Sequence, residues 1–235
     1  MIPQLPLALR WPRRQRFDHF HAGANAAALA AVEQLAREPG APWLYLHGPA
    51  GCGKSHLLMA ACQAAGEAGQ GVQYLPLARL ADGAAAIRGV AGGALLALDD
   101  LGTIAGKREA EHALFDLYNR AKAEGAALLF AAEAAPAQLG LGLPDLRSRL
   151  GACTRFALQP LEDAERRAVL KAQAGLRGIE LDDHVLDWLF ARHTRDLGAL
   201  LDLLDRLDQA SLAAQRRVTI PFLRELLREA DAAGG

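Results

Sequence analysis

Several features that mark common classes of protein are missing from this sequence of 235 residues. Its three cysteines, Cys52, Cys62 and Cys153, have the spacing of neither a disulfide framework nor a metal site. No apolar run approaches the roughly 20 residues that a membrane helix needs. The first residues lack the charged, apolar and small-residue regions of a signal peptide. We therefore expect a cytoplasmic protein with reduced thiols and no membrane partner.

An excess of either charge is also absent, since 26 basic residues oppose 27 acidic ones. Such a chain has no bulk attraction to nucleic acid, so contact with DNA requires a local patch or a partner. Aromatic residues are scarce, at 6%, whereas apolar residues make up 51% of the chain and can bury a core. The abundance of alanine, leucine and glycine favours helix-rich packing.

The chain divides by pattern into three segments. Residues 1–16 hold three prolines and are typical of a tail. In residues 17–160, apolar strands alternate with helices. Strands are expected at 43–47, 72–77, 94–98, 126–131 and 153–158, and helices at 23–38, 54–68, 80–90, 109–124 and 144–150. This alternation predicts an α/β domain whose five-stranded parallel sheet is covered on both faces.

The last segment, residues 161–235, has no strand pattern. Helices are expected at 162–174, 183–192, 196–213 and 221–230. Pro221 suits the first turn of the last helix, and Thr219 lies near enough to cap it. We expect a small all-helical domain after the sheet domain.

A glycine-rich phosphate loop follows the first strand directly. It consists of Gly48, Pro49, Ala50, Gly51, Cys52, Gly53, Lys54 and Ser55. Glycines let successive backbone N–H groups point at phosphate oxygens, and the following helix adds a favourable dipole. Lys54 can reach the β- and γ-phosphates, and the Ser55 hydroxyl can ligate Mg²⁺. The loop predicts binding of ADP or ATP with Mg²⁺.

Two acids end the apolar run at residues 95–98. Asp99 is expected to hold the magnesium shell, and Asp100 to polarise an attacking water. The alternative is that the two acids cap the loop that follows them. The phosphate loop upstream favours the magnesium role.

These motifs resemble the AAA+ ATPases of the DnaA lineage. Residues 48–60 (GPAGCGKSHLLMA) and 96–101 (LALDDL) carry the resemblance, together with an entry segment at 17–25 that in this lineage lies beside the adenine. The segments 115–120, 139–150 and 219–222 are similar to those of the regulatory inactivators of the initiator DnaA. The resemblance implies an AAA+ sheet domain followed by a helical lid.

Particular roles follow from the resemblance alone. Arg149 matches the arginine finger that projects into a neighbouring subunit's nucleotide site, with Arg147 as the other candidate. Arg195 matches the second sensor, which reaches the phosphates from the lid; the alternative is a capping or ion-paired arginine. Asn25 and His56 are expected among the nucleotide contacts, although His56 can instead pack under the loop. Glu133 replaces the shorter polar residue of the first sensor, so we expect at most weak ATPase activity.

The tail resembles a peptide by which bacterial replication proteins dock on the sliding clamp, the β subunit of DNA polymerase III. Gln4 offers an amide to a polar subsite, and Leu5, Leu7 and Leu9 are suited to an apolar groove. The alternative is that these leucines pack on the chain's own domain. An arginine cluster follows, comprising Arg10, Arg13, Arg14 and Arg16. Such a cluster is typical of a solvated linker, and the alternative is contact with DNA threaded through the clamp.

The resemblance implies a negative regulator of replication initiation. The nucleotide-bound protein would dock on the DNA-loaded clamp, stimulate hydrolysis of ATP bound to DnaA, and be associated with the nucleoid through the clamp. A homo-oligomer, most simply a dimer, is expected. The alternatives are a related helicase loader and, from another class, a P-loop kinase of small molecules.

Overall fold

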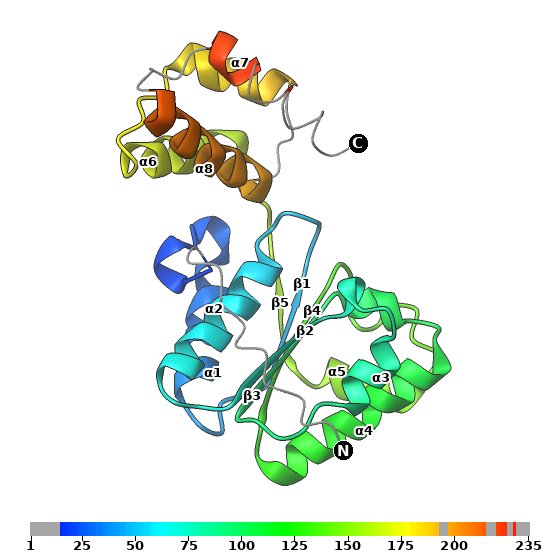
Figure 1. Ribbon diagram of the computed structural model, residues 1–235. Coiled ribbons are helices and arrows are strands. Elements are labelled where there is room, and N and C mark those ends of the chain that lie inside the picture. Colours follow the sequence, from blue (N-terminus) through cyan, green and yellow to red (C-terminus); the bar gives the residue numbers. More distant parts are fainter. Residues whose placement is uncertain (1–14, 193–196, 215–219, 225–227, 229–235) are drawn as a thin grey trace. The chain divides into compact units, whose positions relative to one another are not determined.

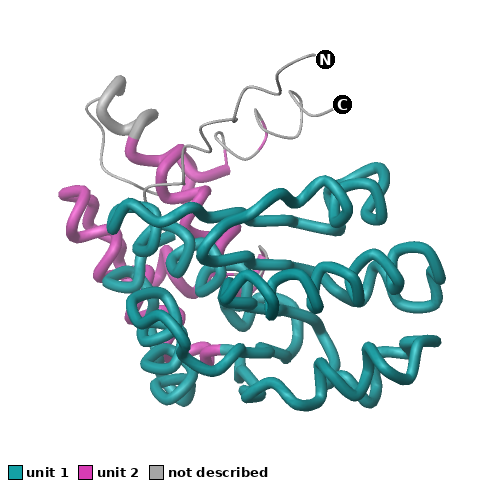
Figure 2. The backbone as a smooth tube through the Cα atoms, turned by 90° about the horizontal axis from the view of Figure 1, so that it is seen from below, with its two compact units in different colours: residues 1–160 teal, residues 161–235 magenta. Residues whose placement is uncertain are grey.

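The computed structural model describes residues 15–192, 197–214, 220–224 and 228. The chain forms two compact units, Met1–Pro160 and Leu161–Gly235. Figure 1 labels their helices and strands, and Figure 2 shows the two units in different colours.

The first unit is built on a five-stranded sheet. Its strands are β1 (Leu44–His47), β2 (Val72–Pro76), β3 (Leu95–Asp99), β4 (Ala127–Ala132) and β5 (Thr154–Ala157). Their order in the sheet is β2-β3-β4-β1-β5, and every pair is parallel. The predicted parallel α/β fold is confirmed. Because parallel strands share one carboxyl edge, the loops after β1, β3 and β4 all leave from that edge.

Helices cover both faces of this sheet (Figure 1). One face carries α1 (Ala26–Arg37) and α2 (Lys54–Glu67), and the other carries α3 (Gly83–Arg88), α4 (Arg108–Glu124) and α5 (Pro144–Gly151). The short 3₁₀ turns are η1 (Phe17–His19), η2 (Gly23–Asn25), η3 (Leu77–Arg79) and η4 (Leu101–Ile104). Each face has its own apolar core, in which Leu57 and Leu114 are fully buried. Strands buried on both sides explain the continuous apolar runs of the sequence.

The helix α3 is clearly shorter than the sequence predicts. The expected helix at 80–90 is α3, which begins only at Gly83. The carboxylate of Asp82 accepts a hydrogen bond of 2.9 Å from the Ala85 N–H and so caps the helix there. The prediction was wrong for residues 80–82 because the alanine-rich pattern hid this cap.

The second unit contains α6 (Asp163–Gly175), α7 (Asp183–Arg192) and α8 (Leu197–Ala214), and residues 220–224 are also helical. Glu162 and Glu165 form a capping box at the start of α6. The helices enclose a leucine-rich core that includes Leu170, Leu186 and Leu223. The described part of this unit contains no strand, as the sequence predicts.

Candidate functional site

The phosphate loop connects β1 to α2 at the carboxyl edge of the sheet. Gly53 adopts a φ of +93°, and a Cβ atom there would lie 2.6 Å from the Phe20 ring. At Gly48, φ is +156° and a Cβ atom would lie 2.3 Å from the carbonyl oxygen of Leu158. Both positions therefore require glycine. The helix α2 starts directly after Gly53, so its first N–H groups are available at the loop.

Lys54 is buried at the base of this loop, with 8% of its surface exposed. Its ammonium donates hydrogen bonds of 2.7 Å to the Gly48 carbonyl and 2.8 Å to the Pro49 carbonyl. The loop's own carbonyls thus hold the ammonium at the base of the loop. This arrangement suits a phosphate ligand.

The two acids lie at the end of the neighbouring buried strand β3. Asp99 is 1% exposed, and its carboxylate accepts 2.8 Å and 3.0 Å hydrogen bonds from the Tyr74 hydroxyl and the Asp100 N–H. Asp100 itself has a left-handed backbone, with φ of +59°. Burial and the charge of Asp99 raise the pKa of Asp100, Lys54 lowers it, and Glu133 raises it. These charges therefore influence one another at a single edge of the sheet.

The residues present fit magnesium bound together with a nucleotide. No group of three or more His, Cys, Asp or Glu side chains suitable for a metal occurs among the described residues. Mg²⁺ on a nucleotide needs only one or two protein oxygens, because phosphates and waters supply the rest. The Ser55 hydroxyl, partly exposed at the start of α2, and the Asp99 carboxylate are such oxygens.

The entry segment is tied to the rest of the unit by the two other predicted nucleotide contacts. The buried amide of Asn25 donates a hydrogen bond to the Gln159 carbonyl and accepts one from the Gln159 N–H, each 2.8 Å long. The His56 ring lies 2.8 Å from the Arg16 carbonyl oxygen and packs edge-on against Phe20. Both side chains therefore hold the segment in place, and their contact with nucleotide stays a prediction.

Arg149 lies on α5 against one face of α4. Its guanidinium is centred 4.3 Å from the Phe115 ring and 5.4 Å from the Tyr118 ring, and it donates a hydrogen bond to Asn119 Oδ1. The side chain remains partly exposed. Arg147 is exposed and makes no ion pair or side-chain hydrogen bond with the residues that the structure describes.

These three contacts of Arg149 were not predicted, although the sequence carried a signal for them. Phe115, Tyr118 and Asn119 follow the spacing i, i+3, i+4, which places them on one face of a helix. Cation–π contacts and a hydrogen bond restrict the guanidinium to one place. The guanidinium of Arg149 is therefore held against α4 rather than free in solvent.

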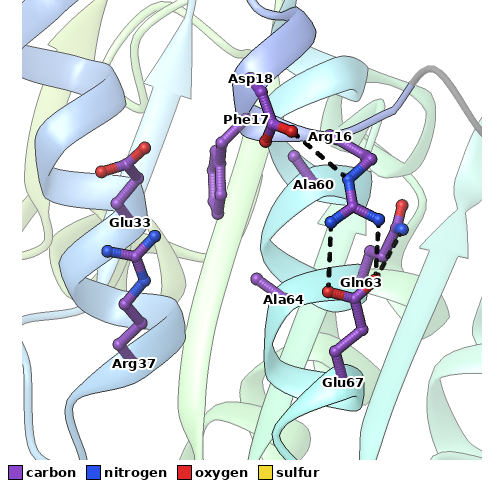
Figure 3. Close-up of a pocket in the computed structure, with 9 residues that line it drawn as sticks. All are labelled: Arg16, Phe17, Asp18, Glu33, Arg37, Ala60, Gln63, Ala64 and Glu67. Atoms are coloured by element: carbon purple, nitrogen blue, oxygen red, sulfur yellow. Dashed lines mark hydrogen bonds and ion pairs between the residues drawn. The ribbon is translucent and has the colours of Figure 1, made fainter.

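A separate pocket of about 330 Å³ lies between η1, α1 and α2 (Figure 3). Phe17, Ala60 and Ala64 form its apolar part, and charged side chains surround them. Arg16 forms ion pairs there with Glu67, at 3.0 Å, and Asp18, at 3.7 Å. None of the residues predicted to bind nucleotide lines this pocket.

Several predicted residues lie outside the described part of the chain. They are Gln4, Leu5, Leu7, Leu9, Arg10, Arg13, Arg14, Arg195 and Thr219. Their roles stay predictions. Among the described residues, no helix has the length and apolar character needed to cross a membrane.

Both units match models of known protein families. Residues 12–156 match the family model of the bacterial DnaA ATPase domain, and residues 163–227 match the model of the Hda lid domain. The structure of DnaA from Aquifex aeolicus bound to AMPPCP has a TM-score of 0.69 at 22% identity, covering 84% of this chain and 66% of that chain.

Two structures from Thermotoga maritima are also similar. Domain III of its replication initiation protein DnaA has a TM-score of 0.73 at 20% identity, covering 93% of this chain and 98% of that chain. Its RuvB Holliday junction branch migration motor has a TM-score of 0.63 at 19% identity, covering 93% and 72%. At these identities the likeness concerns the fold.

Proposed function

This chain belongs to the DnaA-related AAA+ family, with the ATPase domain of bacterial DnaA and the lid domain of Hda, and on this premise we propose a mechanism. The chain is thus a nucleotide-binding, DnaA-related regulator of replication. The specific proposal is that it acts negatively: it stimulates hydrolysis of ATP bound to the initiator DnaA and so inactivates the initiator.

The nucleotide of this chain has a structural role in the proposal. Lys54 and the N–H groups at the start of α2 bind the phosphates of ADP or ATP, and Ser55 and Asp99 hold Mg²⁺. Arg195 of the lid, Asn25 and His56 complete the set of nucleotide contacts. Mg²⁺ would neutralise phosphate charge when bound.

Turnover in this site is expected to be slow. Asp100 is proposed to orient the water, and the charge of Glu133, which stands in place of the shorter polar residue of the first sensor, acts on Asp100 at the same edge of the sheet. The carboxylate of Glu133 would also repel a γ-phosphate. ADP is therefore the proposed ligand of the working state.

The observation that carries the proposal is the way α4 holds Arg149. A guanidinium that is partly exposed and restricted by Phe115, Tyr118 and Asn119 can enter a neighbouring subunit's site without losing much further rotamer freedom. There it stabilises the charge that develops on the transferred phosphoryl group, an effect worth a factor of about 10³–10⁵ in kcat for arginine fingers.

The tail is proposed to bring the protein to DNA by binding the sliding clamp. Gln4, Leu5, Leu7 and Leu9 are proposed to dock on the sliding clamp, and the arginine cluster at 10–16 to lie nearest the DNA. Within that cluster, Arg16 is already paired with Glu67 and Asp18, so its charge is partly neutralised. A dimer associated with the nucleoid through the clamp is the proposed state.

The test compares Arg149→Ala with the matched variant Arg147→Ala. Each protein is incubated with ATP-bound DnaA and clamp loaded on DNA, and the ADP bound to DnaA is measured over time. We expect Arg149→Ala to abolish the stimulation while it still binds nucleotide and clamp, and Arg147→Ala to retain it. Full stimulation by Arg149→Ala would refute the assignment of the finger.

A further inference from the structure

Four polar or charged side chains are buried in the part of the chain that the structure describes: Asn25, Lys54, Asp99 and Glu111. The first three belong to the predicted nucleotide site. Glu111, on α4, is 2% exposed and has no role in it. A carboxylate is costly to bury unless it is fully hydrogen-bonded, so its position calls for an explanation.

Both carboxylate oxygens of Glu111 accept hydrogen bonds from backbone N–H groups. Oε1 accepts from Gly106, at 2.7 Å, and from Gly142, at 3.0 Å. Oε2 accepts from Leu143, at 2.7 Å. Bonds to an ionised acceptor are stronger and more directional than those between neutral groups. Glu111 therefore joins two loops that are distant in sequence.

The first of these loops begins at the acids of β3. Asp100 is followed at once by η4, and its carbonyl accepts hydrogen bonds from both the N–H and the hydroxyl of Thr103. Gly106 lies just beyond this turn. The contact of Glu111 with Gly106 thus anchors the segment that leaves the nucleotide side of the sheet.

The second loop leads into α5, which carries Arg149. Leu143 is the N-cap residue of α5 and provides no side-chain cap. The carboxylate of Glu111 accepts the Leu143 N–H, the bond that the acid of a capping box makes, and places negative charge at the start of the helix. Leu146 and Leu150 of α5 pack in the same core as Leu101. Because apolar contacts are not directional, the hydrogen bonds that Glu111 accepts from Gly142 and Leu143 restrict where α5 begins within that core.

We infer that Glu111 is a positioning residue for Arg149: it holds α5 in the place from which the guanidinium reaches the neighbouring nucleotide. A helix moves as a rigid body over so few residues, so a shift at Leu143 is transmitted to Arg149. The inference rests on the proposed function of Arg149 as a finger.

The experiment compares Glu111→Gln with Glu109→Gln. Glu109 lies on the same helix but is exposed, and among the residues that the structure describes its side chain forms a 3.7 Å ion pair with Arg88. The amide of Glu111→Gln keeps one acceptor oxygen and turns an N–H group toward a backbone donor. We expect the maximal rate of stimulated hydrolysis to fall at least tenfold at saturating regulator, while the half-saturating concentration and the protein's own affinity for ADP stay unchanged. Glu109→Gln should match the unmodified protein.

Two further measurements separate positioning from folding. Amide hydrogen exchange should accelerate at Gly106, Gly142 and Leu143 in Glu111→Gln, but not elsewhere on α4. Glu111→Asp, which keeps the charge on a shorter side chain, should recover part of the maximal rate. If Glu111→Gln does not melt cooperatively, the rate and exchange of Glu111→Asp decide the question in the same way.

The outcomes distinguish this inference from the proposed function. If Arg149→Ala retains full stimulation, the finger itself is wrong. If Arg149→Ala abolishes stimulation but Glu111→Gln equals Glu109→Gln, the positioning role of Glu111 is overturned. A variant that loses ADP affinity together with rate, or failure of both Glu111 variants to melt cooperatively, would mean a general structural role and would also overturn it.

Discussion

Replacement of Asn25 by alanine should destabilise the first unit. The Asn25 amide is buried and bonds both the carbonyl and the N–H of Gln159, a residue 134 positions away. It closes the entry segment onto the end of β5. Alanine removes both hydrogen bonds and supplies no replacement.

The size of the effect follows from these two bonds. A hydrogen bond of this kind contributes a net ~0.5–1.5 kcal/mol, so the two together contribute about 1–3 kcal/mol. Gln159 is an exposed residue, so we expect water to replace Asn25 as the partner of its backbone groups and no large desolvation penalty to be added. Asn25→Asp should cost as much or more, because its carboxylate would face the Gln159 carbonyl in place of a donor.

The assay is urea unfolding without nucleotide, with Gln34→Ala as the control. Gln34 lies on α1, which follows Asn25 directly, and its exposed side chain donates a hydrogen bond to Glu38. We expect that control to change the free energy of unfolding by less than about 0.5 kcal/mol. An Asn25→Ala midpoint equal to that of the control would refute the structural tie. The added stability in saturating ADP then reports separately on whether Asn25 contacts the nucleotide.

Three other perturbations have defined outcomes. Burial and Asp99 raise the pKa of Asp100 above the unfolded value of 3.8, so its ionised form opposes folding at neutral pH. Asp100→Asn should therefore raise the melting temperature near pH 7. A gain of the same size near pH 3, where the acid is protonated in both states, would contradict this cause. Gly48→Ala must place a Cβ atom 2.3 Å from the Leu158 carbonyl oxygen. It should destabilise the first unit by on the order of 1–3 kcal/mol and abolish ADP binding. A normal ADP titration of this variant would count against the geometry of the loop. Gln4→Ala combined with Leu7→Ala should abolish retention on immobilised sliding clamp without changing ADP affinity, and unchanged retention would exclude the docking role of the tail.

The sequence by itself determined the elements and the phosphate loop of this protein. The strands and helices leave periodic apolar patterns over a few residues, and the loop needs glycines at positions close together in the chain. Such signals are local, so they can be recognised without knowing which strands are neighbours. The boundary of α3 was missed because alanine suits either face of a helix and hid the cap at Asp82.

Only the tertiary structure decided how distant residues are brought together. The sheet order β2-β3-β4-β1-β5 places the acids of β3 near the loop after β1, although β4 is the strand between them. The hydrogen bonds between Glu111 and Leu143 and between Asn25 and Gln159 each join residues that are distant in sequence, and no local pattern shows that they meet. The stacking of Arg149 on Phe115 depends on how α4 and α5 pack, which the apolar core and the hydrogen bonds of Glu111 determine together. Periodicity shows which face of a helix is buried, but it does not show what that face meets.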